Sequence, residues 1–189
     1  SAGAFAEVYR ALAQDADEIV SIHISAKLSG TCQSALLGRQ SAPQGCRIEV
    51  VDSQHLSMAQ GLVVLVAARA ARDGERLDAV VRLAQDAVRR VHVYAVLDTL
   101  EYLRKGGRIG RLQAFLGSLL HIKPMLSFRD GAPYPLERVR TRARALDRLC
   151  ELTRQLKGIR DMAVMYNTTP IEADALADRL GGCYPREKM

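Results

Sequence analysis

The sequence is poor in aromatic side chains, which make up 5% of its 189 residues. Proteins that bind single-stranded nucleic acids commonly stack bases on such rings, so this scarcity speaks against that class. The formal net charge of +6 favours nucleic-acid binding, because an excess of basic residues attracts acidic partners. A basic nucleic-acid or nucleotide-binding module therefore remains the alternative hypothesis. No recognition motif supports it, and no nucleic acid is expected as a partner.

The sequence also lacks closely spaced cysteine pairs. Its four cysteines are widely scattered, and none forms a C-x-x-C pair. This spacing argues against a zinc site and against a disulfide framework. We expect reduced thiols, no bound metal and a cytoplasmic protein. The four are Cys32, Cys46, Cys150 and Cys183.

No hydrophobic run is long enough to cross a bilayer. The longest apolar stretch covers residues 62–68 and stops at Arg69, whereas a membrane-spanning helix needs about 20 apolar residues. Glu7 interrupts any signal-peptide pattern at the start. The sequence thus gives no indication of a membrane span or of export.

Catalytic and nucleotide-binding motifs are missing as well. The sequence contains no G-x-G-x-x-G after a strand, no P-loop, no H-E-x-x-H and no G-x-S-x-G nucleophile elbow. The four histidines are far apart, and no acid-base partner can be assigned to Ser29. We therefore expect no cofactor and no catalytic machinery of the chain's own.

The first half of the chain alternates between strand and helix patterns. Hydrophobic residues make up 48% and charged residues 25%, which suits a globular protein of one or two domains. Alternating strands and helices favour parallel strand pairing. The predicted strands are residues 18–24, 47–52 and 91–97, and the predicted helices between them are 31–42, 57–71 and 76–90.

The pattern changes near Asp98. Strands at 122–128 and 134–139 flank Asp130-Gly131, a pair typical of an antiparallel hairpin. The predicted fold class is α/β, with a parallel βα unit over residues 1–98 followed by a smaller α+β unit over 99–189. Its other elements are short helices through Lys105 and near 112–120, helices at 141–156 and 171–180, and a strand at 162–166.

The segment after the first strand has the chemistry of an anion site. It reads Leu-Ser-Gly-Thr at residues 28–31, between an apolar strand and a helix. A helix N-terminus offers free N–H groups, to which Ser29 and Thr31 add hydroxyls and Gly30 adds close backbone approach. Such a site suits a carboxylate or a phosphate. The alternative is that Ser29 or Thr31 only caps the helix, and the two roles are compatible.

This motif and five others, in the same order, resemble the DegV family of bacterial fatty-acid-binding proteins. The match spans nearly the whole chain. The family's preceding strand-rich segment with a Thr-Ser pair has no counterpart, nor has its closing glycine-rich segment with a histidine, so we expect an internal fragment or a truncated relative. The other five segments are Val51-Asp52-Ser53, Ala59-Gln60-Gly61-Leu62 and residues 100–110, 116–126 and 139–146.

The resemblance implies a fatty-acid-binding role. In this family the acyl chain lies in an apolar cleft or tunnel between two domains, and a loop matching Ser29, Gly30 and Thr31 holds the carboxylate. Burial of the tail should dominate affinity. For any single residue proposed for the tunnel wall, an ordinary core position is the favoured alternative. These candidates are Leu28, Leu116, Leu119, Ile122 and Met125.

The resemblance also implies a partner. DegV proteins that serve as the binding subunit of a fatty acid kinase present the bound acid to a separate ATP-dependent kinase subunit. Arginines matching Arg108 and Arg138 would lie on that docking surface. The arginines between residues 140 and 148 have an alternative interpretation as a solvated helix face.

Overall fold

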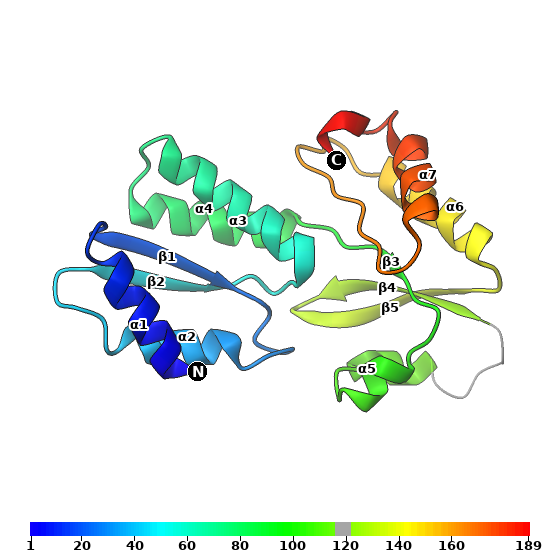
Figure 1. Cartoon of the computed structure of the whole chain (residues 1–189). Helices are drawn as coiled ribbons and strands as arrows, with labels where there is room; N and C mark the ends of the chain where they lie inside the picture. Colours follow the sequence, from blue (N-terminus) through cyan, green and yellow to red (C-terminus); the bar gives the residue numbers. More distant parts are fainter. Residues whose placement is uncertain (116–121) are drawn as a thin grey trace. The chain divides into compact units, whose positions relative to one another are not determined.

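The chain folds into two compact units, shown in the computed structural model of Figure 1. The structure describes residues 1–115 and 122–189. Unit 1 comprises Ser1–His92 together with Arg129–Ala132, and unit 2 comprises Val93–Phe128 and Pro133–Met189. The chain thus first changes unit between His92 and Val93, whereas the sequence pattern predicted a change near Asp98.

Unit 1 is built on a parallel pair of strands. The register runs from Glu18 opposite Arg47 to His23 opposite Asp52, as the alternating sequence pattern predicts. The helices pack in two pairs, α1 with α2 and α3 with α4. The elements are α1 (Ala2–Leu12), β1 (Glu18–His23), α2 (Thr31–Arg39), β2 (Arg47–Asp52), α3 (Ser57–Arg72) and α4 (Leu77–Arg90).

Strand β1 presents different chemistry on its two faces. Val20 and Ile22 pack against the apolar core of α3 and α4. Ser21 and His23 point the other way, because side chains alternate along a strand. The Ser21 hydroxyl lies 2.7 Å from the Tyr9 hydroxyl of α1 and 2.7 Å from Nε2 of His23. This half-buried polar cluster links the strand to α1.

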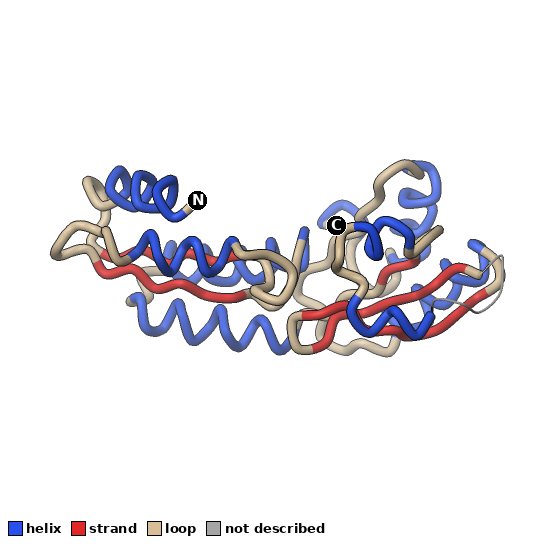
Figure 2. The backbone as a smooth tube through the Cα atoms, turned by 90° about the horizontal axis from the view of Figure 1, so that it is seen from below, coloured by secondary structure: helices blue, strands red, loops and turns tan. Residues whose placement is uncertain are grey.

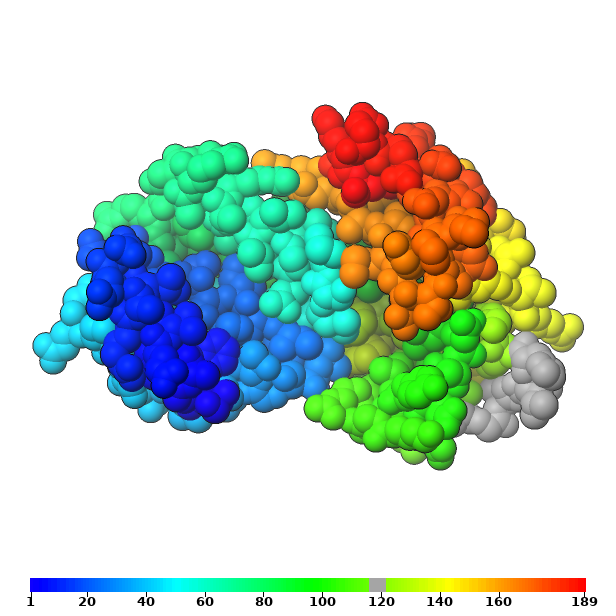
Figure 3. Space-filling view, in the orientation of Figure 1, coloured from blue at the N-terminus to red at the C-terminus, as the bar shows by residue number. Residues whose placement is uncertain are grey.

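Helices α1 and α2 approach closely at Gly38. A Cβ atom at this position would lie 2.5 Å from Cβ of Phe5 and 2.9 Å from the carbonyl oxygen of Ala2. Only a residue without a side chain fits such a contact without movement of the neighbour. On its outer side α1 exposes Val8 and Leu12, and it lies at the surface in the space-filling view of Figure 3.

Unit 2 combines a small sheet with helices. The order of strands is β3-β4-β5, and β3 pairs antiparallel with β4, with Ala95 opposite Leu126. The tube in Figure 2 shows the long β4 and β5 side by side. The elements are β3 (Ala95–Val96), α5 (Glu101–Lys105), a 3-10 helix (Gly110–Phe115), β4 (Lys123–Arg129), β5 (Ala132–Val139), α6 (Arg142–Arg154), α7 (Pro170–Leu180) and a 3-10 turn (Arg186–Lys188).

The predicted hairpin is confirmed. Strands β4 and β5 are joined by Asp130 and Gly131, whose φ angles of 52° and 76° are those of a type I′ turn. The helix that follows begins where the sequence places it, and the Thr141 side chain caps it by accepting a hydrogen bond from the Arg144 N–H. The α/β fold class with an antiparallel hairpin is therefore correct.

Two strand predictions are wrong. The predicted strand 91–97 is reduced to Ala95–Val96, and it pairs antiparallel with β4 in unit 2 rather than parallel in unit 1. Its apolar pattern could not show which later strand would pair with it. Residues 162–166 are not a strand, and Met165 and Tyr166 are exposed. An apolar run forms a strand only where a neighbour completes the hydrogen-bond ladder.

The second predicted short helix, near 112–120, is a 3-10 helix over Gly110–Phe115 within the described residues. The remainder of that prediction, residues 116–120, lies outside them. Among the described residues, none of the helices combines the length and the apolar character that a bilayer-spanning segment requires.

Candidate functional site

The candidate site lies at the carboxyl end of the parallel strands of unit 1. Because His23 and Asp52 stand side by side in the register, the chain leaves both strands at the same edge. Ligands of open α/β sheets bind at this edge. Residues 24–30 form the β1 loop, which leads into α2, and residues 53–56 form the β2 loop, which leads into α3.

The β1 loop is folded around Ser25, which is fully buried. The Ser25 carbonyl accepts hydrogen bonds from the N–H groups of Leu28 and Ser29, at 2.9 and 3.1 Å. The Ser25 hydroxyl accepts one from the Lys27 N–H at 3.2 Å and donates one to the Gly131 carbonyl at 2.6 Å. Ser25 therefore fixes the path of the loop up to Ser29.

The predicted headgroup residues come together at the start of α2. The hydroxyls of Ser29 and Thr31 lie 2.8 Å apart, and the Thr31 N–H donates to Oγ of Ser29 at 3.3 Å. Gly30 is the N-cap residue, and a Cβ there would meet nothing within 4 Å. Two hydroxyls beside a helix N-terminus can bind one carboxylate or phosphate. Neither Ser29 nor Thr31 is the N-cap residue, although the Ser29 hydroxyl accepts the N–H of the first helical residue.

The β2 loop is a compact block of polar contacts. Ser53 and His55 are buried, and the Ser53 hydroxyl bonds the backbone of His55 in both directions, at 3.2 and 3.3 Å. Oδ1 of Asp52 accepts the Gln54 N–H at 2.8 Å. Gln54 has a φ of 54°, an uncommon conformation for a residue with a side chain. Burial lowers the pKa of His55, whose Nε2 lies 3.1 Å from the Val88 carbonyl oxygen.

Cys32, the second residue of α2, directly follows the headgroup residues in the sequence. Its side chain is buried. Burial raises the pKa of the thiol, and the negative charge of Asp52 raises it further. Both effects disfavour the thiolate, which is the reactive form of cysteine.

The predicted tunnel residues are only partly described. Leu116 and Leu119 lie outside the described residues. Leu28 in unit 1 and Ile122 in unit 2 are half-buried. Met125 is fully buried in a core cluster of unit 2, so any contact with an acyl chain remains a prediction.

The two predicted docking arginines are both exposed in unit 2 but differ in their contacts. Nη1 of Arg108 donates to the Gly106 carbonyl at 2.5 Å. Arg138 stacks on Phe115, with the guanidinium 4.5 Å from the ring centre, and donates to the Ala114 carbonyl at 2.6 Å. Arg138 therefore supports the 3-10 helix, whatever its role toward a partner.

The arginines of α6 are engaged within unit 2. Arg142 pairs with Glu172 at 2.9 Å, Arg144 with Glu151 at 3.3 Å, and Arg148 with Glu137 at 2.7 Å. These ion pairs favour the alternative interpretation of the run between residues 140 and 148 as a solvated helix face, here with its arginines paired within unit 2.

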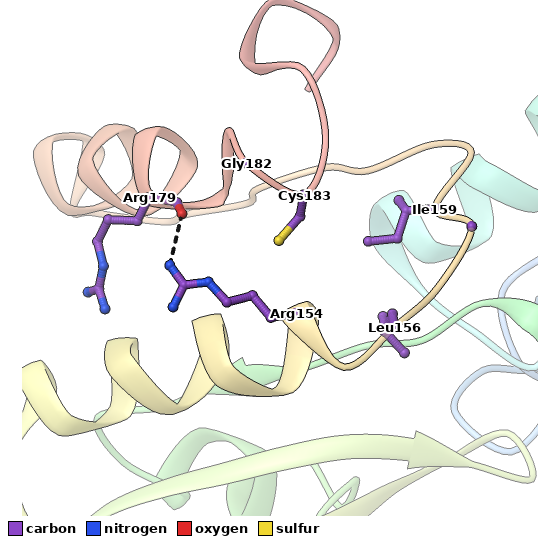
Figure 4. A pocket seen from close by; sticks show the side chains of 7 residues that line it. Arg154, Leu156, Ile159, Arg179, Gly182 and Cys183 are labelled. Atoms are coloured by element: carbon purple, nitrogen blue, oxygen red, sulfur yellow. Dashed lines mark hydrogen bonds between the residues drawn. The ribbon is translucent and has the colours of Figure 1, made fainter.

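A pocket of about 410 Å³ lies in unit 2 (Figure 4). Nη2 of Arg154 donates across it to the Arg179 carbonyl at 3.3 Å, and Arg179 pairs with Asp147 at 2.7 Å. None of the predicted site residues lines this pocket. Its lining residues are Arg154, Leu156, Gly158, Ile159, Arg179, Gly182 and Cys183.

Sequence reasoning missed the roles of Ser25 and Asp52. The Asp52 side chain also accepts the Ala26 N–H at 3.2 Å, so it contacts both loops. The signal was available, since both residues are polar and lie at or just beyond the carboxyl ends of apolar strands. A polar residue at a strand end is common, however, and its partners cannot be deduced from spacing.

Comparison with known proteins decides the family. The model of the family described as "Uncharacterised protein, DegV family" matches residues 1–189. The chain belongs to the DegV family. The resemblance drawn from the sequence motifs is thus confirmed.

Relatives and solved structures of the DegV family agree with this assignment. A DegV domain-containing protein of Streptomyces coelicolor is 44% identical over 93% of this chain and 63% of its own length. DegV from Bacillus subtilis, a fatty acid binding protein of known structure, is 31% identical, with a TM-score of 0.86 over 98% of this chain and 67% of that one. A Thermus thermophilus DegV protein whose structure describes fatty acid binding is 41% identical, with a TM-score of 0.76 over 82% of this chain and 55% of that one.

The chain spans somewhat less than two thirds of the length of the curated DegV relatives from Streptomyces coelicolor and Mycobacterium bovis that it matches. DegV proteins of known structure with this fold bind fatty acids.

Proposed function

We propose that this chain binds a long-chain fatty acid and holds its carboxylate at Ser29, Gly30 and Thr31. The observation that carries the proposal is the pair of hydroxyls, 2.8 Å apart, at the N-terminus of α2 in a DegV protein. Solved DegV relatives bind fatty acids, which supports the same ligand class here. The scattered free thiols fit a cytoplasmic protein.

The tail should supply most of the affinity and the headgroup the orientation. Burying a methylene group gains about 0.8 kcal/mol, so a sixteen-carbon chain gains on the order of 10 kcal/mol before ordering costs. A hydrogen bond to a charged group contributes roughly 1.5–3 kcal/mol. We keep Leu28, Leu116, Leu119, Ile122 and Met125 as candidates for the apolar tunnel that holds the tail.

We also propose that the chain performs no chemistry itself and presents the carboxylate to a separate ATP-dependent kinase subunit. The net charge of +6 favours an acidic partner surface. Arg108 is the better candidate for docking, because it is exposed and directly follows the Gly106-Gly107 turn after α5. Arg138 remains a second candidate.

Mass spectrometry tests the ligand class. The natively purified protein is extracted under denaturing conditions, and the extract is examined for fatty acids. We expect one fatty acid for each chain, and none in extract from a protein of another fold purified in parallel. A chain without lipid that also fails to take up added fatty acid would contradict the proposal. Tight, salt-sensitive binding of RNA or DNA would instead support the nucleic-acid alternative.

A further inference from the structure

The carboxylate of Asp52 joins the two loops of the candidate site. A single oxygen, Oδ1, accepts the Gln54 N–H of the β2 loop at 2.8 Å and the Ala26 N–H of the β1 loop at 3.2 Å. Asp52 is the last residue of β2, so its backbone is held in the parallel sheet. The two loops are thus tied to a fixed point at the end of a strand.

The contact between Asp52 and Ala26 is linked to Ser29 through the neighbouring residue Ser25. The residue before Ala26, Ser25, donates its N–H to the His55 carbonyl at 2.8 Å and accepts the Ser29 N–H at 3.1 Å. A shift of Ala26 therefore moves the turn that carries the Ser29 hydroxyl. One hydroxyl hydrogen bond is sensitive to displacements of a few tenths of an ångström.

The second contact stabilises an unfavourable backbone. Gln54 adopts a φ of 54°, in the left-handed region that a residue with a side chain rarely occupies. The hydrogen bond from the Gln54 N–H to Asp52 stabilises this conformation. The carbonyl of the next residue, His55, accepts the Ser25 N–H of the β1 loop. The Ala26 contact and the Ser25–His55 hydrogen bond thus both depend on the position of one oxygen atom, Oδ1 of Asp52.

We propose that Asp52 is a positioning residue that sets the preference of the site for a carboxylate over an uncharged headgroup. This inference rests on the proposed function of Ser29 and Thr31. The role is geometric rather than electrostatic, because a negative charge next to an anionic ligand does not favour its binding. An amide oxygen in the same place can accept the same two hydrogen bonds.

Four variants separate the place of the oxygen from its charge. Asp52→Asn keeps the oxygen and removes the charge, Asp52→Glu keeps the charge and moves the oxygen by one methylene, and Asp52→Ala removes both. Ser29→Ala serves as the reference for a lost headgroup contact. For each protein, affinity is measured for a fatty acid and for the alcohol of the same chain length.

We expect Asp52→Glu and Asp52→Ala to lose about tenfold of the acid-over-alcohol preference, the equivalent of about one hydrogen bond, with alcohol affinity unchanged. Asp52→Asn should keep the wild-type preference or exceed it. Thermal unfolding identifies the variants that fold, and one folded variant of the Glu and Ala pair is sufficient.

The outcomes are distinguishable. A wild-type protein that binds acid and alcohol equally would overturn the headgroup role of Ser29, and with it the basis of the inference. A wild-type preference that persists in folded Asp52→Glu or Asp52→Ala would overturn the role of Asp52 alone. Equal losses for acid and alcohol would show a purely structural residue, and a loss in Asp52→Asn equal to that in Asp52→Glu would overturn the geometric account.

Discussion

The hydroxyl of Ser29 can serve a helix and a ligand at the same time. Its oxygen accepts the Thr31 N–H, which leaves its hydrogen to be donated elsewhere. The Thr31 hydroxyl, 2.8 Å away, is one acceptor, and a carboxylate oxygen at the end of α2 would be a stronger one. The contact with the Thr31 N–H uses the hydroxyl oxygen and headgroup binding uses the hydroxyl hydrogen, so the two do not compete.

Replacement of Ser29 by alanine tests this pairing. We expect Ser29→Ala to weaken fatty-acid binding by roughly tenfold to a hundredfold, through loss of one charge-assisted hydrogen bond. Titration with a fluorescent fatty acid measures the effect. Ser41→Ala, which alters an exposed serine just beyond the other end of α2, is the matched control and should bind as wild type does. Unchanged affinity in folded Ser29→Ala would remove Ser29 from the site.

The half-buried His23 makes unit 1 sensitive to acid. Burial lowers the pKa of His23 below its ordinary value of about 6.5. The unfolded chain then takes up a proton at a higher pH than the folded chain, so stability is fully present above about pH 6.5 and falls as the pH drops below it. Burial of His55 acts in the same direction.

Urea unfolding at about pH 7.5 and about pH 5.5 measures this dependence. We expect wild type to lose more stability on acidification than His23→Gln, whatever the absolute stability of the variant. An identical slope in wild type and His23→Gln would show that His23 is not responsible.

At the level of helices, strands and turns, the sequence pattern predicted correctly those features that depend on neighbouring residues. β2 has the predicted bounds, and the Asp130-Gly131 turn and the Thr141 cap form as expected, because each depends on a few neighbouring residues. The strand predictions for residues 91–97 and 162–166 were wrong because strand formation depends on distant residues. A strand needs a partner, and the sequence around it does not specify where in the chain that partner lies.

The contact between α1 and α2 leads to opposite predictions for two glycines. Gly38→Ala should destabilise the protein by about 1–3 kcal/mol, because its Cβ would lie 2.5 Å from that of Phe5 and overpacking outweighs the gain in helix propensity. Gly3→Ala, in α1, meets nothing closer than 3.9 Å and should stabilise by up to about 1 kcal/mol. Denaturant midpoints compare the two variants. Equal effects of the same sign would show that the helices do not pack as described.

At the level of the whole molecule, the family and the Leu-Ser-Gly-Thr loop could be predicted because their evidence is contiguous in the sequence. The hydrogen bonds that hold that loop in place could not be predicted from the sequence. Ala26 and Asp52 are brought together by a parallel register, and Ser25 and Gly131 by a turn that comes much later in the chain. Such contacts follow from topology rather than from motifs.

The docking proposal gives a prediction for the assembled system. Arg108→Glu should reduce acyl-phosphate formation with the partner kinase and ATP, while fatty-acid affinity of the variant alone stays near wild type, because rim charges control encounter more than tail burial. Arg104→Glu, an exposed arginine in α5, is the control for net charge.

The salt dependence completes this test. The defect of Arg108→Glu should be largest at low ionic strength and shrink as salt screens the surface. Equal phosphorylation by Arg108→Glu and wild type at low and physiological salt would exclude the docking role. A defect shared by Arg104→Glu would point to overall charge instead. Arg138→Glu is less informative, since it also loses the contacts with Phe115 and Ala114.

Because Arg129–Ala132 belong to unit 1, the order of synthesis affects the candidate site. The buried hydroxyl of Ser25 finds its acceptor, the Gly131 carbonyl, 106 residues further along the chain. At about 5–20 residues per second, a ribosome needs roughly 5–20 seconds to make that stretch. During this interval the loop that carries Ser29 lacks one of its supports, so a nascent chain becomes fully competent for ligand only after the hairpin has emerged.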